Sequence, residues 1–452
     1  MSKIQRITGL QYEFSLFNPS EDFDIYHTLF LQSDLGKVYL GIPWDELVAS
    51  FKLKESGKGP DTFFSPRGKL GLMFLKNYSQ VSDKKLIEQL NSNIDYQFFC
   101  DMHLGYTRLT NYKIVSQIRC ELAKNLNISE QEKVLASYWS SFINNKSSIF
   151  TDATCYESEV RYPTDQKLLW EAIQWSYNQM RKICTYLEIK IPRTKYLKWK
   201  KRYLGYSKMR RKLNSKRRVL TRSLLHLLNK INTELDKIEL QYSFEMPTLY
   251  DDRRKTISKI YEQQEHLFTT GEYPKNRIIS ISKNYLRPIV RGKEIKKVEF
   301  GAKVNKLQID GINFIQRISF DAFNEGVELE NTVYKAQQLT KVKVKTLGAD
   351  AIYASNKNRN FVSNNFIKTD FRPKGKKPKD YKQQQKARAV ISKERATRLE
   401  GSFGKDKEHY HLKKVKAKTP STEKLWIFFG IHVANALEIG RRIVEAQLQK
   451  SA

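Results

Sequence analysis

The spacing of apolar residues changes from a strand pattern to a helix pattern and back along the last two-thirds of the chain. Apolar and polar residues alternate in Ser147–Val160, which predicts a strand. Apolar residues then recur every three or four positions across Leu169–Ile238, which predicts long amphipathic helices. Alternation returns over 296–320, in two runs about the turn signal Asp310-Gly311. A helical segment of roughly 165–290 is therefore expected to interrupt a region that forms a sheet.

The order of the later elements narrows the fold. The chain continues with a helix ("ELENTVYKAQQL"), a strand that ends at Asp350, a short helix ("NKNRNFVSNN") and a short strand ("FIKTDF"). Arg372–Arg388 carries eight Lys or Arg against one Asp and is expected to be a basic loop, with a helix beginning near Ala389 and a last one over about Glu423–Leu448. Without the insertion, three antiparallel strands precede α/β alternation, which is the order of a ribonuclease-H-like sheet. The predicted fold class is α+β/α/β: an N-terminal all-helical domain, then a ribonuclease-H-like mixed sheet interrupted by a long helical insertion.

Three domains are expected from these patterns. Residues 1–140 form the N-terminal helical domain, 145–165 together with 290–452 form the catalytic core, and 166–289 form the insertion. Within the first domain, two short helices meet at a polar break with Ser82 placed as the N-cap of the second. This pair favours a DNA-binding helix-turn-helix and a plain helical hairpin about equally.

Charge is distributed unevenly along the 452 residues. Lys plus Arg number 81 against 48 for Asp plus Glu, a net charge of +33. Residues 1–150 hold 17 basic and 16 acidic side chains, so the excess lies almost entirely in 151–452. An excess of this size indicates a partner rich in phosphate, of which double-stranded DNA is one. The densest basic stretch contains ten cations and no carboxylate: Lys201, Arg202, Lys208, Arg210, Arg211, Lys212, Lys216, Arg217, Arg218 and Arg222.

Several classes of protein are excluded. No apolar run reaches the ~18 residues of a membrane span, and the N-terminus lacks the apolar centre of a signal peptide. The four cysteines lie far apart without CxxC spacing, so a disulfide framework or zinc finger is not expected. A reducing, cytoplasmic protein is the expected class.

Acidic residues occupy three positions that the predicted topology brings to one cleft. Asp152 lies on the first strand, Asp350 at the end of the fourth, and Glu400 on a late helix. Carboxylate oxygens of this kind can hold two Mg²⁺ ions for phosphoryl transfer, and Mn²⁺ is expected to substitute. Other acids compete for these positions: Glu157 and Glu159 for the first, Asp310, Asp370 and Asp380 for the second, and Glu394 for the third.

Four segments carry a resemblance to a known family. "TDATCYESEVRYPTD" (Thr151–Asp165), "RPIVRGKEIKKVEFGAKV" (Arg287–Val304), "GADAIYASNKNRNF" (Gly348–Phe361) and "RLEGSFGKDK" (Arg398–Lys407) resemble the DDE transposases of bacterial insertion sequences. "FFSPRGKLGLMFLKNYSQVSDKKLIEQLNSNIDYQFFC" is similar to their N-terminal helical domain.

The resemblance implies specific roles for residues in the last of these segments and elsewhere. It implies that Asp152, Asp350 and Glu400 are the catalytic, metal-binding acids, and that Lys407 contacts DNA near the cut. Related transposases have an Arg four residues before the Glu, where this chain has Ala396, and often a Gly where it has Ala351. The DNA-contacting residues expected around the Glu are therefore Arg395, Arg398, Lys405 and Lys407, and the choice between the two arginines stays open.

The leading hypothesis is a transposase that acts as a homo-oligomer, such as a dimer on paired ends. It would bind the terminal inverted repeats of its own element, hydrolyse the strands and transfer the 3′-hydroxyl ends to target DNA. The neutral N-terminal region would contribute sequence choice or subunit pairing. The alternatives are a ribonuclease-H-like nuclease without strand transfer and a catalytically silent DNA-binding repressor derived from a transposase.

Overall fold

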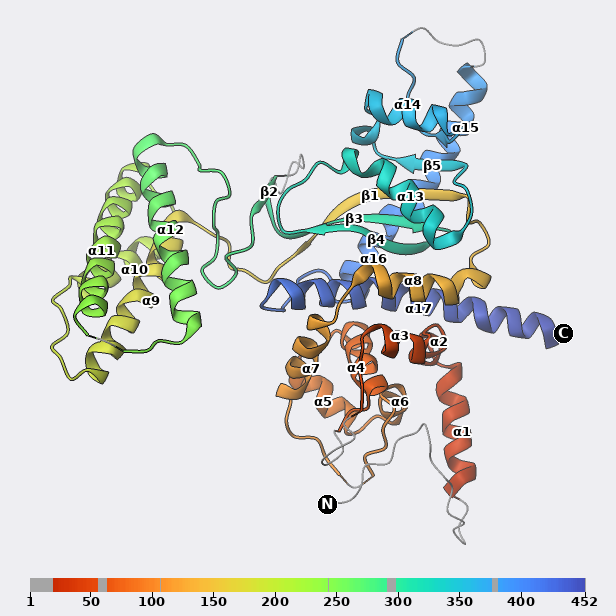
Figure 1. Cartoon of the computed structure of the whole chain (residues 1–452), viewed down its shortest axis with the longest axis horizontal. Helices are drawn as coiled ribbons and strands as arrows, with labels where there is room; N and C mark the ends of the chain where they lie inside the picture. The colour runs from red at the N-terminus through yellow and green to blue at the C-terminus, as the bar shows by residue number, and fades with distance from the viewer. Residues whose placement is uncertain are drawn as a thin grey trace. The chain divides into compact units, whose positions relative to one another are not determined.

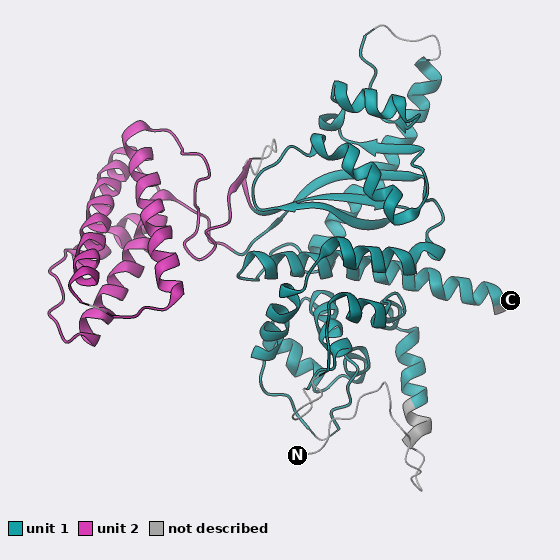
Figure 2. Ribbon diagram, in the orientation of Figure 1, with its two compact units in different colours: residues 1–159, 301–452 teal, residues 160–300 magenta. Residues whose placement is uncertain are grey.

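The computed structural model describes residues 19–55, 63–105, 107–242, 244–290, 298–375 and 381–451. The chain divides into two compact units, one made of residues 1–159 and 301–452 and the other of 160–300 (Figure 2). The N-terminal helices and the sheet belong to the same unit. The division into three domains stays a prediction.

A mixed sheet lies at the centre of the first unit (Figure 1). The strands of this unit are β1 (Ser148–Glu157), β3 (Val298–Ile309), β4 (Ile312–Ser319), β5 (Thr346–Ala349) and β6 (Lys368–Thr369). β2 (Pro288–Val290) and the first three residues of β3 belong to the unit 160–300. β1 pairs antiparallel with β3 and parallel with β5, β3 pairs antiparallel with β4, and β5 pairs parallel with β6. Three antiparallel strands followed by parallel ones confirm the expected ribonuclease-H-like order.

The turn between β3 and β4 shows how the local sequence sets the register of the sheet. Asp310 and Gly311 both have positive φ, +50° and +86°. Two successive residues in this left-handed region match the twist of a tight hairpin, and Asp and Gly adopt it at low cost. The predicted hairpin is confirmed.

Helices precede the sheet in the first unit, as predicted. They are α1 (Pro19–Gln32), α2 (Asp34–Leu40), α3 (Trp44–Ser50), α4 (Pro66–Ser79), α5 (Asp83–Leu90), α6 (Ile94–Phe99), α7 (Lys113–Lys124) and α8 (Ile128–Trp139), followed by a 3₁₀ turn, η1 (Ser140–Phe142). The expected break lies between α4 and α5. There Gln80 takes a left-handed conformation and the Ser82 hydroxyl caps α5 by accepting from the Lys85 N–H at 3.2 Å. The helix-turn-helix function of this pair stays a prediction.

The last helix, α17 (Pro420–Ser451), holds the N-terminal helices and the sheet together. It packs against α2, α4, α7 and β4 (Figure 1). Its apolar stretch is core rather than membrane span: Phe428, Ile431 and Val433 are completely buried. Gly440 permits the close approach of α2, because a Cβ there would lie 1.9 Å from the Lys37 carbonyl oxygen. None of the helices in the described ranges is long and apolar enough to cross a membrane.

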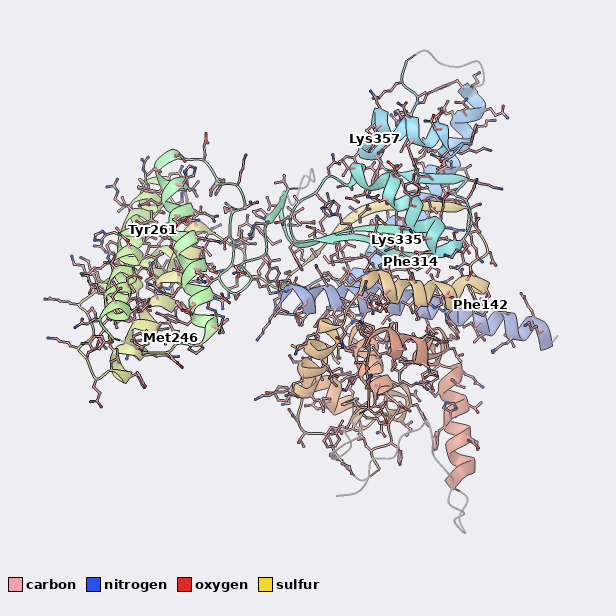
Figure 3. The ribbon with its side chains drawn as sticks, in the orientation of Figure 1. Phe142, Met246, Tyr261, Phe314, Lys335 and Lys357 are labelled. Carbon is pink, nitrogen blue, oxygen red and sulfur yellow. The ribbon has the colours of Figure 1, made fainter. Side chains whose placement is uncertain are left out.

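A buried carboxylate joins α8 to the sheet. Glu132 accepts from the Ile315 N–H at 2.6 Å and from Lys335 Nζ at 2.6 Å. Figure 3 shows Lys335 and Phe314 at this junction between the sheet and α8. Burial acts to raise the pKa of Glu132, but the nearby charge of Lys335 and the contact with His432 outweigh it and hold the pKa below its usual value. The N-terminal helices are therefore bound to the sheet by a fixed charge as well as by apolar packing.

The second unit is a helical bundle. Its helices are α9 (Asp165–Tyr186), α10 (Tyr196–Lys208), α11 (Asn214–Gln241) and α12 (Thr248–Thr270). The predicted apolar face of α11 lies in the core, where Leu224, Leu228, Ile231 and Leu235 are completely buried. The sequence predicts helix throughout Leu169–Ile238, which includes the basic stretch Lys201–Arg222. This stretch is instead divided between the end of α10 and the start of α11, because the chain leaves the helix between Lys208 and Asn214.

The remaining elements of the first unit are helical. They are η2 (Glu325–Glu328), α13 (Leu329–Thr340), η3 (Ala351–Tyr353), α14 (Asn356–Asn364), α15 (Tyr381–Glu394), a π-helix η4 (Arg395–Glu400) and α16 (Gly401–His409). The expectation of a loop over Arg372–Arg388 was wrong in its second half, and α15 begins at Tyr381 rather than near Ala389. The Gln, Lys, Ala and Arg residues there are good helix formers, and this preference outweighs their charge. Residues 376–380 of the expected loop lie outside the described residues.

Candidate active site

Two of the three predicted acids, Asp152 and Asp350, come from the neighbouring strands β1 and β5. In the parallel pairing of β1 with β5, Thr151 lies opposite Ala349, so Asp152 and Asp350 come next on the two strands. The Asp152 side chain is 20% exposed. Asp350 is exposed at the end of its strand and caps η3, where its Oδ1 accepts from the Ala351 N–H at 2.6 Å. The pairing therefore places both carboxylates at the same part of the sheet.

Glu400 reaches this part of the sheet from a π-helical turn. In a π-helix the backbone hydrogen bonds join residues five apart, and such turns are rare and frequent at functional sites. Arg395 and Glu400 are five residues apart in η4, and Arg395 Nη1 lies 3.1 Å from Glu400 Oε1. The wide turn thus brings these two side chains together.

The Arg395 guanidinium lies among the acids. Besides Glu400, it approaches Asp152 Oδ2 to 3.8 Å and Asp370 Oδ2 to 3.6 Å, and it is only 13% exposed. Arg398 points to a different partner, since its Nη1 lies 3.4 Å from Asp310 Oδ1 in the β3–β4 turn. Of the two arginines that the sequence left open, Arg395 is the one beside Asp152 and Glu400.

Asp370, which the sequence offered only as a competitor for the second acidic position, lies beside Arg395 as well. Its side chain is 6% exposed and its Oδ1 accepts from the Ala349 N–H at 3.1 Å. Burial raises the pKa of Asp370. The available signal was its position directly after β6, because ligand-binding residues gather at the carboxyl ends of parallel strands.

Apart from Asp370, the rival acids that the structure describes lie elsewhere. Glu157 is at the far end of β1, five positions from Asp152, and Glu159 lies beyond the strand. Glu394 is exposed on α15, before the π-helical turn. Asp310 occupies the hairpin turn, where Arg442 and Arg398 pair with it. Asp380 lies outside the described residues. The catalytic roles of Asp152, Asp350 and Glu400 stay a prediction.

Asp152 carries a destabilised charge. Burial raises its pKa to about 6; the Ala153 N–H and Arg395 oppose this, while Asp350 and Glu400 add to it. A carboxylate that is both desolvated and repelled by two others favours a nearby cation. Its oxygens, with those of Asp350 and Glu400, are the donors that hard divalent cations prefer. In the described part of the chain, no group of three Asp, Glu, His or Cys side chains is already arranged to hold a metal ion. The Arg395 guanidinium lies beside Asp152 and Glu400 instead.

This raised pKa predicts that Asp152→Asn stabilises the fold at neutral pH. Between about pH 4 and pH 6 the folded chain keeps a proton on Asp152 that the unfolded chain has lost, so stability falls as the pH rises through this window. At pH 8 the variant should gain up to about 3 kcal/mol in its free energy of unfolding. Below pH 4 both forms are neutral and the gain should vanish. Urea unfolding of both proteins in EDTA at pH 4 and pH 8 measures it, and an equal gain at both values would contradict the prediction.

The helix after Glu400 is fixed to the sheet by a buried ion pair. Lys306 on β3 is 0% exposed and pairs with Asp406 on α16, which is 1% exposed. The pairing of β3 with β4 is irregular between Asn305 and Lys306, and a bulge of this kind changes the direction of a side chain. Tyr156 on β1 also donates to Asp406. These contacts fix how α16, and with it η4, lies across β1.

Two of the expected DNA contacts also lie on α16. Lys407 Nζ donates to Thr154 Oγ1 on β1 at 3.2 Å and is partly buried, and Lys405 is exposed. Asp152, Thr154 and Tyr156 alternate on the face of β1 that meets η4 and α16. Lys407 therefore lies on the same face of β1 as Asp152.

The basic stretch Lys201–Arg222 lies in the unit 160–300. All ten of its cations are exposed, and within the described ranges none of them has a carboxylate within ion-pair distance. Several lie over aromatic rings, as Arg202 does over Trp199 at 4.9 Å and Lys212 over Tyr206 at 5.8 Å. Because none of these cations pairs with a carboxylate of the described residues, their charges are available to bind phosphate.

Two family models match the chain. A model described as a transposase DDE domain matches residues 347–435, which include Asp350 and Glu400. A second, described as a transposase domain (DUF772), matches residues 32–120, from α1 to α7. Together they indicate an insertion-sequence DDE transposase.

The two matches cover only part of the candidate active site. DDE transposases generally use divalent metals and act on DNA, which agrees with the donor set around Asp152. Residues 121–346 lie outside both matches. The interpretation of β1 with Asp152, and of the unit 160–300, therefore depends on the structure and the sequence alone. No curated protein and no solved structure matches this chain.

Proposed function

We propose that this transposase binds the terminal inverted repeats of its own element, cuts the strands with water and joins the freed 3′-hydroxyl ends to target DNA. The observation that carries the proposal is the meeting of Asp152, Asp370 and Glu400 at Arg395, next to Asp350. The same displacement at phosphorus accounts for both reactions. Water attacks and the 3′-oxygen leaves in the first, and the 3′-oxygen attacks and a target 3′-oxygen leaves in the second.

Asp152, Asp350 and Glu400 would hold the metal ions, with Mg²⁺ the expected ion and Mn²⁺ a substitute. Two such ions activate the attacking oxygen and stabilise the leaving one. Asp152 contributes a rigid ligand, since β1 is paired on both sides. Glu400 contributes a movable one, since its side chain is 49% exposed and pairs with Arg395.

Arg395 is proposed to release the acids as DNA arrives. A guanidinium binds phosphate through two parallel hydrogen bonds, as it does a carboxylate. The backbone of the bound strand can therefore take the place of Glu400 as its partner. Lys407, held beside Thr154, and the exposed Lys405 and Arg398 would add cations along the same strand.

The basic stretch Lys201–Arg222 is proposed to hold phosphates of the element end or of flanking DNA. Each phosphate that a cation neutralises contributes roughly −0.9 to the slope of log affinity against log salt. Replacing Arg210, Arg211, Arg217 and Arg218 by alanine should therefore flatten the slope by up to about 3.6. Filter binding over a series of salt concentrations measures the slope.

Four exposed lysines on α11 and α12 provide the matched control: Lys230, Lys237, Lys255 and Lys259. They lie in the same unit, and acids accompany them along both helices. Their replacement by alanine removes the same charge and should change the slope much less. Equal slopes for the two fourfold variants would contradict a specific role of the basic stretch.

The proposed function is tested with labelled duplexes that carry the inverted repeat found beside the gene. Cleavage at the repeat and joining of the labelled 3′ end to a plasmid, both in Mg²⁺, are expected. Cleavage without joining would indicate the nuclease, and binding of the repeat without either reaction would indicate the repressor. Measuring the mass of the complex by light scattering tests the proposed dimer on paired ends.

A further inference from the structure

The Asp370 carboxylate lies beside Arg395, but the structure holds it differently from the proposed metal ligands. Its side chain is 6% exposed, against 20% for Asp152 and 49% for Glu400. Its Oδ1 accepts from the Ala349 N–H at 3.1 Å, at the point where the short strand β6 has ended. A carboxylate that is buried and bonded to the main chain has little freedom to turn toward a metal ion. Asp370 is therefore better suited to hold a neighbouring side chain than to bind metal.

The second oxygen of Asp370 faces Arg395. Asp370 Oδ2 lies 3.6 Å from Arg395 Nε. On the other side of the guanidinium, Arg395 Nη1 lies 3.1 Å from Glu400 Oε1 and 3.8 Å from Asp152 Oδ2. Arg395 Nε is buried and has no hydrogen-bond partner in the part of the chain that the structure describes. Buried N–H groups are rarely left in this state, and a movement of about 0.5 Å would bring Nε within hydrogen-bond distance of Asp370.

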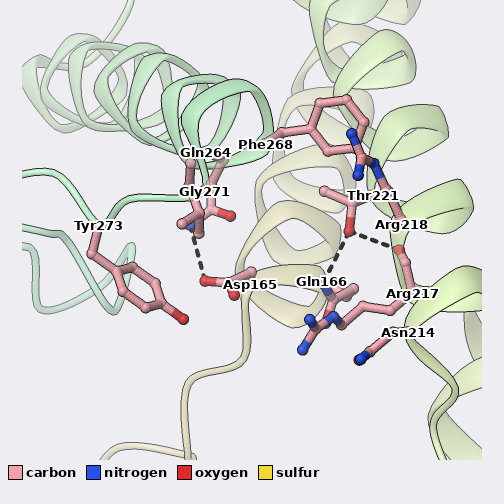
Figure 4. Close-up of a pocket in the computed structure, with 11 residues that line it drawn as sticks. Asp165, Gln166, Asn214, Arg217, Arg218, Thr221, Gln264, Phe268, Gly271 and Tyr273 are labelled. Atoms are coloured by element: carbon pink, nitrogen blue, oxygen red, sulfur yellow. Dashed lines mark hydrogen bonds between the residues drawn. The ribbon is translucent and has the colours of Figure 1, made fainter.

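An arginine of this chain can present its charge to phosphate without an acid beside it. Arg217 and Arg218, in the basic stretch, line a cavity of the unit 160–300 (Figure 4). The Asp165 carboxylate in the wall of that cavity accepts from Gln264 Nε2 at 3.3 Å, and no ion pair joins either arginine to a described carboxylate. The acids around Arg395 are therefore not explained by the need to hold an arginine for DNA.

The charge of the metal ions gives Asp370 a purpose. With divalent ions at Asp152, Asp350 and Glu400, Arg395 would lose both partners of its Nη1 and lie beside an excess of positive charge. A guanidinium stays in such a place only if it keeps an anion of its own. Asp370 contacts Arg395 and is not one of the proposed ligands.

We propose that Asp370 is a positioning residue that takes over the charge of Arg395 when the metal ions bind. Arg395 Nε moves onto Asp370 Oδ2, and Nη1 releases Glu400 and Asp152. Both Nη groups then become available to a phosphate of the bound strand. The inference rests on the proposed function in taking Asp152, Asp350 and Glu400 as the metal ligands, and its test needs neither DNA nor cleavage.

The test is Mn²⁺ binding by the full chain at pH 8, measured by isothermal titration calorimetry without DNA. Asp370→Asn removes the charge and keeps an oxygen for the Ala349 N–H. Arg395 is then left with acids that the ions also need, so the affinity for Mn²⁺ should fall by more than about tenfold. Arg395→Met removes the competing cation at similar length and should tighten Mn²⁺ binding severalfold.

The two variants combined separate positioning from metal binding. If Asp370 acts through Arg395, Asp370→Asn should weaken Mn²⁺ binding about tenfold more in the unaltered chain than in the Arg395→Met chain. Equal weakening in both chains would mean that Asp370 acts on the ions directly, and it would overturn the proposal. An unchanged affinity of Asp370→Asn would overturn it as well. So would a failure of Arg395→Met to tighten binding, a result that does not depend on the folding of Asp370→Asn.

Asp310→Asn is the matched control. Asp310 is also a largely buried acid beside arginines of the same unit, since it pairs with Arg398 and Arg442 in the β3–β4 turn. Its replacement removes the same charge away from the proposed ligands and should change the affinity for Mn²⁺ by less than about twofold. An unaltered chain that binds no Mn²⁺ would refute the metal site of the proposed function together with this role of Asp370, whereas the other contrary results refute the role of Asp370 alone.

Discussion

Replacement of Asp152, Asp350 or Glu400 by alanine is expected to lower the rate of DNA cleavage in Mg²⁺ by at least about 10³-fold, or roughly 4 kcal/mol of transition-state stabilisation. Each acid would supply oxygen ligands from a different element: Asp152 from β1, Asp350 from the end of β5 and Glu400 from η4. Single-turnover cleavage of a labelled end is the measurement.

DNA binding by the same variants should be retained or improved, since each removes a negative charge near phosphate. Glu394→Ala is the matched control, because it removes an exposed acid from the turn before η4. It should cleave at nearly the unaltered rate. Full cleavage by Asp152→Ala, Asp350→Ala or Glu400→Ala would remove that residue from the site.

The sheet and its connections could be predicted because they depend on short-range patterns. Alternation over Ser147–Val160 and the Asp310-Gly311 turn specify their own local structure, whatever the rest of the chain does. The order of these elements then leaves few topologies. The element boundaries were harder, as α15 shows, because charge and helix propensity disagree between Tyr381 and Arg388.

The neighbours of the predicted acids could not be read from the sequence. Arg395 and Arg398 are three residues apart, and only the π-helical turn decides that Arg395 meets Asp152. Asp370 depends on the pairing of β6 with β5, a strand of two residues. Lys306 looks like an outward-facing lysine of an alternating strand until the bulge and α16 are both in place. Each of these contacts joins residues through tertiary structure that no local pattern encodes.

Asp406→Ala is expected to destabilise the first unit by about 3–5 kcal/mol. It leaves the fully buried Lys306 ammonium without its carboxylate and the Tyr156 hydroxyl without its acceptor. Hydrogen exchange of peptides from β1 and α16 during urea unfolding measures the loss in this unit separately from residues 160–300. Glu408→Ala on the same helix breaks only an exposed pair with Lys413, beyond the end of the helix, and should cost at most about 1 kcal/mol.

The pH dependence identifies the cause of this loss. Burial lowers the pKa of Lys306, and Asp406 opposes that effect in the unaltered chain. Without Asp406 the folded chain binds this proton still less readily than the unfolded chain, so the stability of the variant should rise with pH. The deficit of Asp406→Ala should therefore shrink between pH 7 and pH 10. A deficit that stays constant would indicate lost packing rather than an unpaired charge.

Removing both charges separates the stability of the pair from its role in positioning Glu400. Lys306→Met combined with Asp406→Leu should restore most of the lost stability, since apolar residues of similar volume often replace a buried ion pair at little cost. The hydrogen bond between Lys407 and Thr154 would still join α16 to β1 in this variant. If the pair positions Glu400, this stable double variant should still cleave more slowly and need more Mg²⁺ for half its maximal rate. Cleavage at the unaltered rate and Mg²⁺ requirement would confine Lys306 and Asp406 to the stability of the fold.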